Sequence, residues 1–273
     1  MVRIMKKIEN LKELQKINIL ILKELYRVAI KNDIKIYLFG GTLIGALRDN
    51  KFIPWDDDID LCLSRNDYEK LVKISKIEFN KEIELLDPYT NDEFRGYIPQ
   101  VVYKKSKLIS KQYREKEENK IGISLFIFDG ITENKVLRWF YYKRMRLLRI
   151  KHALCRANFS YVNTSIAKKI GPVLQPFFKS EDVYKYKHKI LELQKKYNYK
   201  DCNLVSANSD TNGYKEISTR KAFEIEKKIL FEGIECLIYS SYKEYLEKCH
   251  PTYKKLPPLE KRKPKHGFLA WYE

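Results

Sequence analysis

Residues 38–68 read LFGGTLIGALRDNKFIPWDDDIDLCLSRNDY, and this stretch decides the fold. It contains a Gly-Gly-Thr turn and then four aspartates among the five residues 56–60. Successive residues of a strand face opposite sides, so a strand here would project Asp56, Asp58 and Asp60 together. Three neighbouring carboxylates repel one another unless a cation lies among them. Oxygen ligands suit a hard ion, so the segment predicts a Mg²⁺ site.

The residues before the aspartates are typical of a phosphate-binding turn. Residues 34–39 predict a strand, and Gly40 and Gly41 allow close backbone approach. We expect Thr42 to cap a helix over residues 43–49, whose N-terminus would attract phosphate. Arg48 and Arg65 are candidate positive contacts to that phosphate. A phosphate-binding turn followed by metal-binding carboxylates is the arrangement typical of a nucleotidyltransferase site.

The Gly-Gly pair and the acidic cluster also have other structural interpretations. A Gly-Gly pair is often a plain turn, and an acidic cluster is often a solvated loop. The spacing of the aspartates also matches the start of an EF-hand loop. That loop needs glycine and then glutamate where this chain has Leu61 and Asp67, so we set the EF-hand aside.

The ungapped run from Gly40 to Leu71 (GGTLIGALRDNKFIPWDDDIDLCLSRNDYEKL) resembles the signature of the LicD family of phosphotransferases. These are relatives of the fukutin-type enzymes within the nucleotidyltransferase-fold superfamily. Residues 231–266 resemble the family's ending, and the middle third matches loosely. The resemblance implies an α+β fold, with a nucleotidyltransferase-like mixed sheet flanked by helices.

The resemblance also implies an activity. Family members move a phospho-alcohol, typically phosphocholine, from a CDP-activated donor such as CDP-choline to a glycan hydroxyl. The acceptor would be a teichoic acid, a capsule or a lipopolysaccharide precursor, and the cofactor would be Mg²⁺ or Mn²⁺. Asp58 and Asp60 would hold the metal, joined by Asp56, while Gly40, Gly41 and Thr42 would seat the donor phosphates.

One position departs from the family pattern. LicD-like proteins carry Asp-x-Phe-x-x-Asp-Gly on a later strand, and its first aspartate completes the catalytic carboxylates. In this chain the pattern falls on residues 124–130, where the first position is Ser124 and the second aspartate is Asp129. Serine is a weak ligand and not a base near neutral pH. We expect Asp129 to face the other side of the strand and to cap the next turn.

Two alternatives to phosphocholine transfer therefore stay open. One is nucleotidyl transfer to RNA or to a small molecule, although no RNA-binding module is apparent and nucleic acid is not the favoured partner. The other is a catalytically impaired nucleotide-binding homologue, for which Ser124 is the argument.

Charge and composition suggest three parts. Residues 1–133 form the predicted catalytic core, residues 134–200 a basic helical insertion, and residues 201–273 a C-terminal part that completes the domain. The net charge is +18, and residues 135–200 alone hold seventeen Lys or Arg against three Asp or Glu. Within this segment, residues 134–158 predict an amphipathic helix with Leu137, Tyr141, Met145, Leu148 and Cys155 on its apolar side.

A basic amphipathic helix has two interpretations. It is either a core helix with a solvated basic face or an attachment to an anionic membrane surface, where a lipid-linked acceptor would lie. No run of eighteen apolar residues and no signal peptide is apparent. Five scattered cysteines favour neither disulfides nor zinc. We therefore expect a cytoplasmic protein, peripheral on the inner face of the membrane.

Overall fold

The computed structural model describes residues 5–115, 117–162, 165–264 and 268–273. The last two residues of the family-like ending, 265 and 266, lie outside these ranges. The main sheet mixes parallel and antiparallel pairs, because β3 runs parallel to β8 and β2 runs parallel to β12. In spatial order its strands are β10 (Ser218–Thr219), β9 (Leu204–Ser206), β8 (Gly122–Ile131), β3 (Asp60–Ser64), β2 (Ile36–Leu38), β12 (Ile234–Tyr239) and β11 (Glu226–Phe231).

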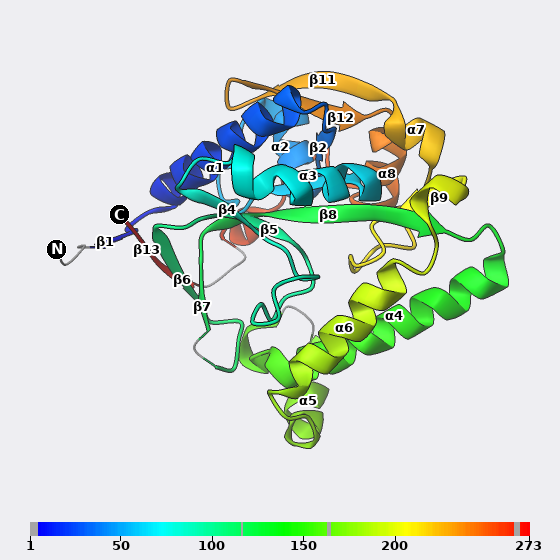
Figure 1. The fold of residues 1–273 in the computed structure, drawn as a ribbon. Helices are drawn as coiled ribbons and strands as arrows, with labels where there is room; N and C mark the ends of the chain where they lie inside the picture. The colour runs from blue at the N-terminus through cyan, green and yellow to red at the C-terminus, as the bar shows by residue number, and fades with distance from the viewer. Residues whose placement is uncertain (1–4, 116, 163–164, 265–267) are drawn as a thin grey trace.

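Helices cover this sheet and complete an α+β fold, as expected. In Figure 1, α1 (Leu11–Lys31) and α3 (Arg65–Glu78) lie on one side of β8, while α4 (Lys135–Arg156) and α6 (Asp182–Gln194) lie on the other. The apolar stripe of α1 buries Leu14, Ile21 and Leu25, which explains why the helix packs on the sheet. The remaining helices are α2 (Gly40–Asp49), α5 (Ser165–Leu174), α7 (Arg220–Glu224), α8 (Tyr242–Cys249) and the short 3₁₀ turns η1 (Phe159–Tyr161), η2 (Gln175–Phe177), η3 (Tyr199–Asp201) and η4 (Leu259–Lys261).

A smaller sheet joins the two ends of the chain. Its strand order is β1 (Lys6–Lys7), β13 (Phe268–Tyr272), β6 (Ser106–Ser110) and β7 (Glu118–Asn119). The C-terminal residues therefore add strands to both sheets. Strand β5 (Gln100–Tyr103) pairs with β8 and with β4 (Ile83–Leu86), whereas β6 pairs with β7 and β13.

The basic segment forms a separate helical layer. Tyr141, Met145 and Leu148 of α4 pack with Ile190 and Leu193 of α6 in a second hydrophobic cluster. The predicted apolar side of α4 is therefore largely core, except that Leu137 is exposed. Gly171 and Pro172, which are residue types that usually interrupt helices, both lie inside α5. Within the described ranges, every helix is too short or too polar to cross a membrane.

Candidate functional site

The aspartate segment is an irregular loop held by α1. The side chain of Gln15 donates a hydrogen bond to the Asp56 carbonyl at 2.9 Å. The side chain of Asn18 donates to the Asp57 carbonyl at 3.3 Å. Both bonds come from one side of a single helix, at positions 15 and 18. They fix the backbone of the loop and therefore the directions in which its carboxylates can point.

The two glycines lie directly against two of the carboxylates. Gly40 has φ of +53°, and a methyl group built on it would lie 3.1 Å from Asp60 Oδ2. A methyl group on Gly41 would lie 2.5 Å from Asp56 Oδ2, closer than real contacts allow. Glycine is therefore required because the carboxylates occupy the space of a side chain. The structure brings together the glycines and acids that the sequence analysis had singled out.

Thr42 has a different role from the predicted one. Helix α2 begins at Gly40, with Phe39 as its cap residue, so Thr42 lies inside the first turn and does not cap the helix. Its Oγ1 accepts a hydrogen bond from the Asp60 backbone N–H at 3.0 Å. The Phe39 N–H donates to the Asp60 carbonyl at 3.0 Å. These two bonds hold the start of β3 against the start of α2.

Three carboxylates converge in the loop, but they are not the three that strand alternation predicts. Strand β3 begins only at Asp60, so the period-two argument is wrong for residues 56–59. Instead Asp56, Asp57 and Asp58 each offer an oxygen atom, and these atoms lie within 4.8 Å of one another. Ligand oxygens around a hexacoordinate hard ion at about 2.1 Å lie about 3–4 Å apart, so these carboxylates would hold Mg²⁺ or Mn²⁺ together after a small closure of the loop. The role of Asp60 as a metal ligand stays a prediction.

Asn18 is a site residue that the sequence analysis missed. Its Oδ1 is buried and has no hydrogen-bond partner among the described residues, although its amide group reaches the aspartate loop. A buried oxygen without a partner costs stability unless a ligand or ion satisfies it. The signal was available, because Asn18 is a polar residue among the buried positions Leu14, Ile17 and Ile21 of the apolar stripe of α1.

Ser124 lies beside Asp60. The two residues are Cα partners across the parallel pair of β3 and β8, and the Ser124 N–H donates to the Ile59 carbonyl at 3.1 Å. The first position of the LicD-like pattern over residues 124–130, which is Ser124, therefore lies next to the acidic loop. A hydroxyl stands there, and it lines the same cavity as Asp57 and Asp58.

Arg65 is paired with a buried carboxylate. It follows the C-terminal end of β3, whereas Asp60 begins that strand. Its guanidinium is buried and donates two hydrogen bonds, at 2.7 and 2.8 Å, to the carboxylate of Asp129. A third bond runs to the Tyr89 hydroxyl at 2.7 Å. A contact of Arg65 with a donor phosphate stays a prediction that this pairing does not favour, and Asp129, expected to cap a turn, instead neutralises a buried cation.

Arg48 also lies away from the glycines. It occupies the last turn of α2, at the opposite end of the helix from Gly40. Its Nε donates to the Asp49 carboxylate at 2.8 Å, and its guanidinium lies 6.0 Å from the centre of the Trp55 ring. Its contact with a donor phosphate remains a prediction that the side-chain position does not favour.

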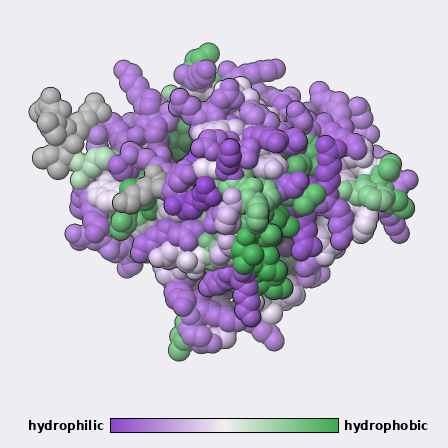
Figure 2. All heavy atoms as spheres, turned by 90° about the horizontal axis from the view of Figure 1, so that it is seen from below, coloured by the Kyte–Doolittle hydropathy of each residue, from purple (hydrophilic) through white to green (hydrophobic). Residues whose placement is uncertain are grey.

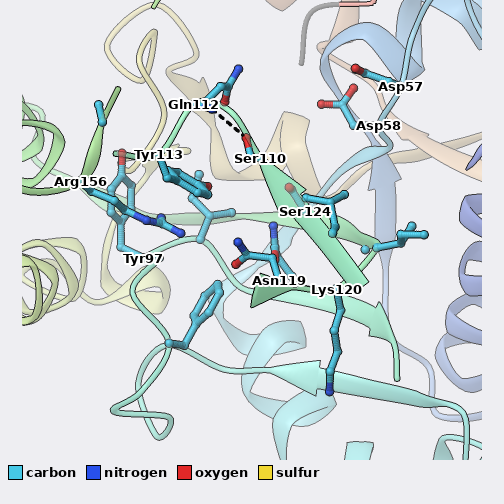
Figure 3. A pocket seen from close by; sticks show the side chains of 18 of the residues that line it. Asp57, Asp58, Tyr97, Ser110, Gln112, Tyr113, Asn119, Lys120, Ser124 and Arg156 are labelled. Atoms are coloured by element: carbon cyan, nitrogen blue, oxygen red, sulfur yellow. Dashed lines mark hydrogen bonds between the residues drawn. The ribbon is translucent and has the colours of Figure 1, made fainter. Parts of the chain in front are cut away.

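A cavity of about 390 Å³ extends from the acidic loop. Figure 3 shows Asp57 and Asp58 at one end, Ser124 between, and Tyr97, Tyr113 and Arg156 at the other end. The remaining polar lining is largely uncharged and comes from β5, β6, β7 and the connecting segments: Gln100, Ser110, Gln112 and Asn119. Among the described residues that line the cavity, Asp57 and Asp58 are the only carboxylates.

The far wall of the cavity carries a paired cation and a neutral histidine. Arg156 donates to both carboxylate oxygens of Glu117 and stacks 3.7 Å from the centre of the Tyr113 ring. Burial lowers the pKa of His152 to about 4, and its ring nitrogen contacts the Arg95 carbonyl at 2.8 Å. His152 is therefore uncharged at neutral pH and donates from Nε2 to that carbonyl.

The arrangement suits chemistry on a phosphate group. A glycine-rich helix start, three clustered carboxylates and a neighbouring cavity would position a diphosphate and neutralise its charge through a divalent ion. The aromatic and amide groups farther along could contact the organic part of a substrate.

Comparison with known proteins agrees with this geometry. Residues 33–163 match the family model described as LicD/FKTN/FKRP, nucleotidyltransferase domain. The chain is 28% identical to the lipopolysaccharide cholinephosphotransferase LicD of Haemophilus influenzae, over 96% of this chain and 97% of that protein. An uncharacterised protein of Rickettsia prowazekii is 37% identical over a short region that covers 20% of each chain.

Proposed function

Because the chain contains a LicD-family nucleotidyltransferase domain over residues 33–163, we propose that it is a phosphotransferase that moves phosphocholine onto a cell-surface glycan. The observation that carries the proposal is the direct packing of Gly40 and Gly41 against Asp60 and Asp56, beside the carboxylate cluster. The similar Haemophilus protein is named for transfer to lipopolysaccharide, so we propose a lipopolysaccharide or related glycan hydroxyl as the acceptor. CDP-choline is the proposed donor.

The divalent cation, Mg²⁺ or Mn²⁺, would be held by Asp56, Asp57 and Asp58 and would supply charge neutralisation for the diphosphate. Gly40, Gly41 and the first turn of α2 would hold the diphosphate in place through backbone N–H groups. The acceptor hydroxyl attacks the phosphorus that bears choline, the bond to the bridging oxygen breaks, and CMP leaves. Positioning and charge stabilisation therefore supply most of the rate enhancement.

The proton of the acceptor hydroxyl must be transferred to a group other than Ser124, because the Ser124 hydroxyl is not a base near neutral pH. Asp57 and Asp58 line the cavity with Ser124, so we propose that one of these carboxylates takes the proton. This keeps the reaction compatible with serine at the position where relatives of this type carry an acid.

The released product distinguishes this activity from nucleotidyl transfer. Purified protein is incubated with CDP-choline, Mg²⁺ and glycan acceptor, and the nucleotide products are separated chromatographically. We expect CMP together with choline-modified glycan. In parallel, CTP replaces CDP-choline, and pyrophosphate is assayed. Pyrophosphate release from CTP, with no CMP from CDP-choline, would contradict phosphocholine transfer and support nucleotidyl transfer instead.

A second candidate function is favoured by Ser124 alone: a protein that binds the nucleotide donor without transferring it. In that case CDP-choline would bind in the presence of Mg²⁺, but no CMP would form with any acceptor. Because glycan acceptors of this kind are often lipid-linked, we also propose that the protein works at the inner face of the cell membrane.

A further inference from the structure

Helix α5 and the turn η2 expose an unusual set of apolar side chains. Ile166 is 71% exposed, Val173 is 68% exposed and Phe177 is 81% exposed, and Ile170 and Leu174 are also exposed. These residues recur every three or four positions, so they share one side of the helix. Figure 2 shows hydrophobic side chains gathered on this face of the molecule, over α5. Such a surface is costly in water and marks a contact with something apolar.

The helix is docked firmly on the rest of the protein in spite of this exposure. Gly171 is buried, and a methyl group built on it would lie 2.1 Å from the ring of Phe159. The side chain of Gln175 donates to the carbonyl oxygens of Leu154 and Ala157, at 3.2 and 2.8 Å. The element is therefore held at the C-terminal end of α4 by one side, and its apolar side faces outward.

Charge identifies the occupant of this surface. Between residues 157 and 180 the chain has three lysines (Lys168, Lys169 and Lys179) and no acidic residue. All three are exposed, as are Lys143, Arg144 and Arg146 on the neighbouring helix α4. An apolar surface with exposed lysines on its own segment complements a lipid bilayer with anionic headgroups. Two copies of the protein would bring two such basic surroundings together, which opposes self-association through the same face.

We propose that α5 and η2 form an interfacial anchor that inserts Ile170, Val173 and Phe177 among the headgroups of an anionic membrane. The predicted membrane contact was the amphipathic helix now identified as α4, but its Tyr141, Met145 and Leu148 are buried against α6. The proposed anchor lies instead in α5 and η2, which follow that helix in the chain.

The position of this anchor bears on the candidate active site. The last turns of α4, to which Gln175 is bonded, supply His152, Ala153 and Arg156 to the wall of the cavity. A membrane-bound α5 would therefore hold one wall of the cavity close to the lipid surface. This consequence rests on the proposed function, in which the acceptor is lipid-linked, whereas membrane binding itself does not.

The test is flotation of the purified protein with vesicles, without donor or acceptor. Vesicles of phosphatidylethanolamine and phosphatidylglycerol are compared with vesicles of phosphatidylcholine alone. We expect binding to the first and little to the second, weakened by added salt because the headgroup attraction is screened. The double variant Val173→Ser/Phe177→Ser should bind roughly tenfold more weakly or worse, since two exposed apolar anchors are lost.

The control variant is Ile77→Ser, which changes an 84% exposed apolar residue on α3. It should bind vesicles like the unchanged protein. Transfer to a water-soluble, delipidated acceptor should be the same in all three proteins, which separates failure of the anchor from failure of the proposed function. Equal vesicle binding by the double variant and the unchanged protein would overturn the proposal. The proposal would also be overturned if the unchanged protein formed a dimer in solution and the double variant were monomeric.

Discussion

Asp60 and Ser124 are direct partners across the parallel strands β3 and β8. Side chains of partnered residues on adjacent strands project to the same side of the sheet. The position that carries a catalytic acid in the LicD-like pattern is therefore next to the acidic loop in this protein, with a hydroxyl in place of the acid.

Replacing this hydroxyl tests whether the position is catalytic. Ser124→Asp would add a carboxylate beside Asp60, within the cavity that Asp57 and Asp58 also line. If the position takes part in proton transfer, kcat should rise by about 10- to 100-fold, within the range of general-base catalysis. Steady-state kinetics of CMP release would measure it. An unchanged kcat, together with loss of activity in Asp58→Ala, would show that another base operates.

The packing of Gly41 predicts a specific defect. In Gly41→Ala the new methyl group would displace the carboxylate of Asp56, because the two would otherwise lie 2.5 Å apart. Displacement of a catalytic group by about 1 Å lowers the rate roughly 100-fold, so kcat/KM should fall by at least that factor. Thermal unfolding provides the control. Because Gly41 lies in the regular first turn of α2, the melting temperature should change little. A variant that is unfolded at room temperature would contradict this expectation of a local defect.

The ion pair of Arg65 and Asp129 predicts an effect on stability. Asp129→Asn would leave a buried guanidinium without its carboxylate, which costs about 3–5 kcal/mol. Urea denaturation followed by circular dichroism would measure the loss. The matched control is Glu235→Gln. It breaks an ion pair with Lys228 in which both side chains are more than half exposed, so it should leave stability nearly unchanged. Similar stability of the two variants would contradict the structural role assigned to Arg65.

His152 predicts a pH dependence of stability. Its pKa is lowered by burial from 6.5 to about 4, so the unfolded chain binds more protons between these values. Stability contributed by the neutral ring is therefore present above about pH 6.5 and is lost as the pH falls toward 4, by roughly 3 kcal/mol at most. His152→Gln should flatten this part of the curve. The matched control for loss of a histidine side chain is His188→Gln, at a half-exposed position.

The regular elements near the site were predictable because their apolar residues are periodic. The strand expected over residues 34–39 is β2, the helix expected over residues 43–49 is α2, and the helix expected over residues 134–158 is α4, each within a few residues of the expected bounds. The two glycines predicted a close neighbour at residues 40 and 41, but the expected neighbour was a phosphate, whereas in the structure the side chains of Asp60 and Asp56 lie there.

The errors come from long-range contacts. The conformation of residues 56–59 depends on hydrogen bonds from Gln15 and Asn18, about forty residues earlier, so strand alternation did not apply. The ion pair of Arg65 joins residues 64 positions apart, and nothing in the local sequence of either partner indicates it. The helical state of α5 depends on its contacts with Phe159 and the end of α4, which outweigh the preference of Gly171 and Pro172 for a break.

The central claim is that the acidic loop and the glycines bind a CDP-alcohol together with a divalent ion. Isothermal titration calorimetry of CDP-choline, CDP-glycerol, CDP-ribitol and CTP, each with and without Mg²⁺, tests it most directly. The account predicts that CDP-choline binds only with Mg²⁺ and that Asp58→Ala abolishes this binding while the protein remains folded. Binding of CTP alone, or binding of CDP-choline that neither needs Mg²⁺ nor responds to Asp58→Ala, would contradict it.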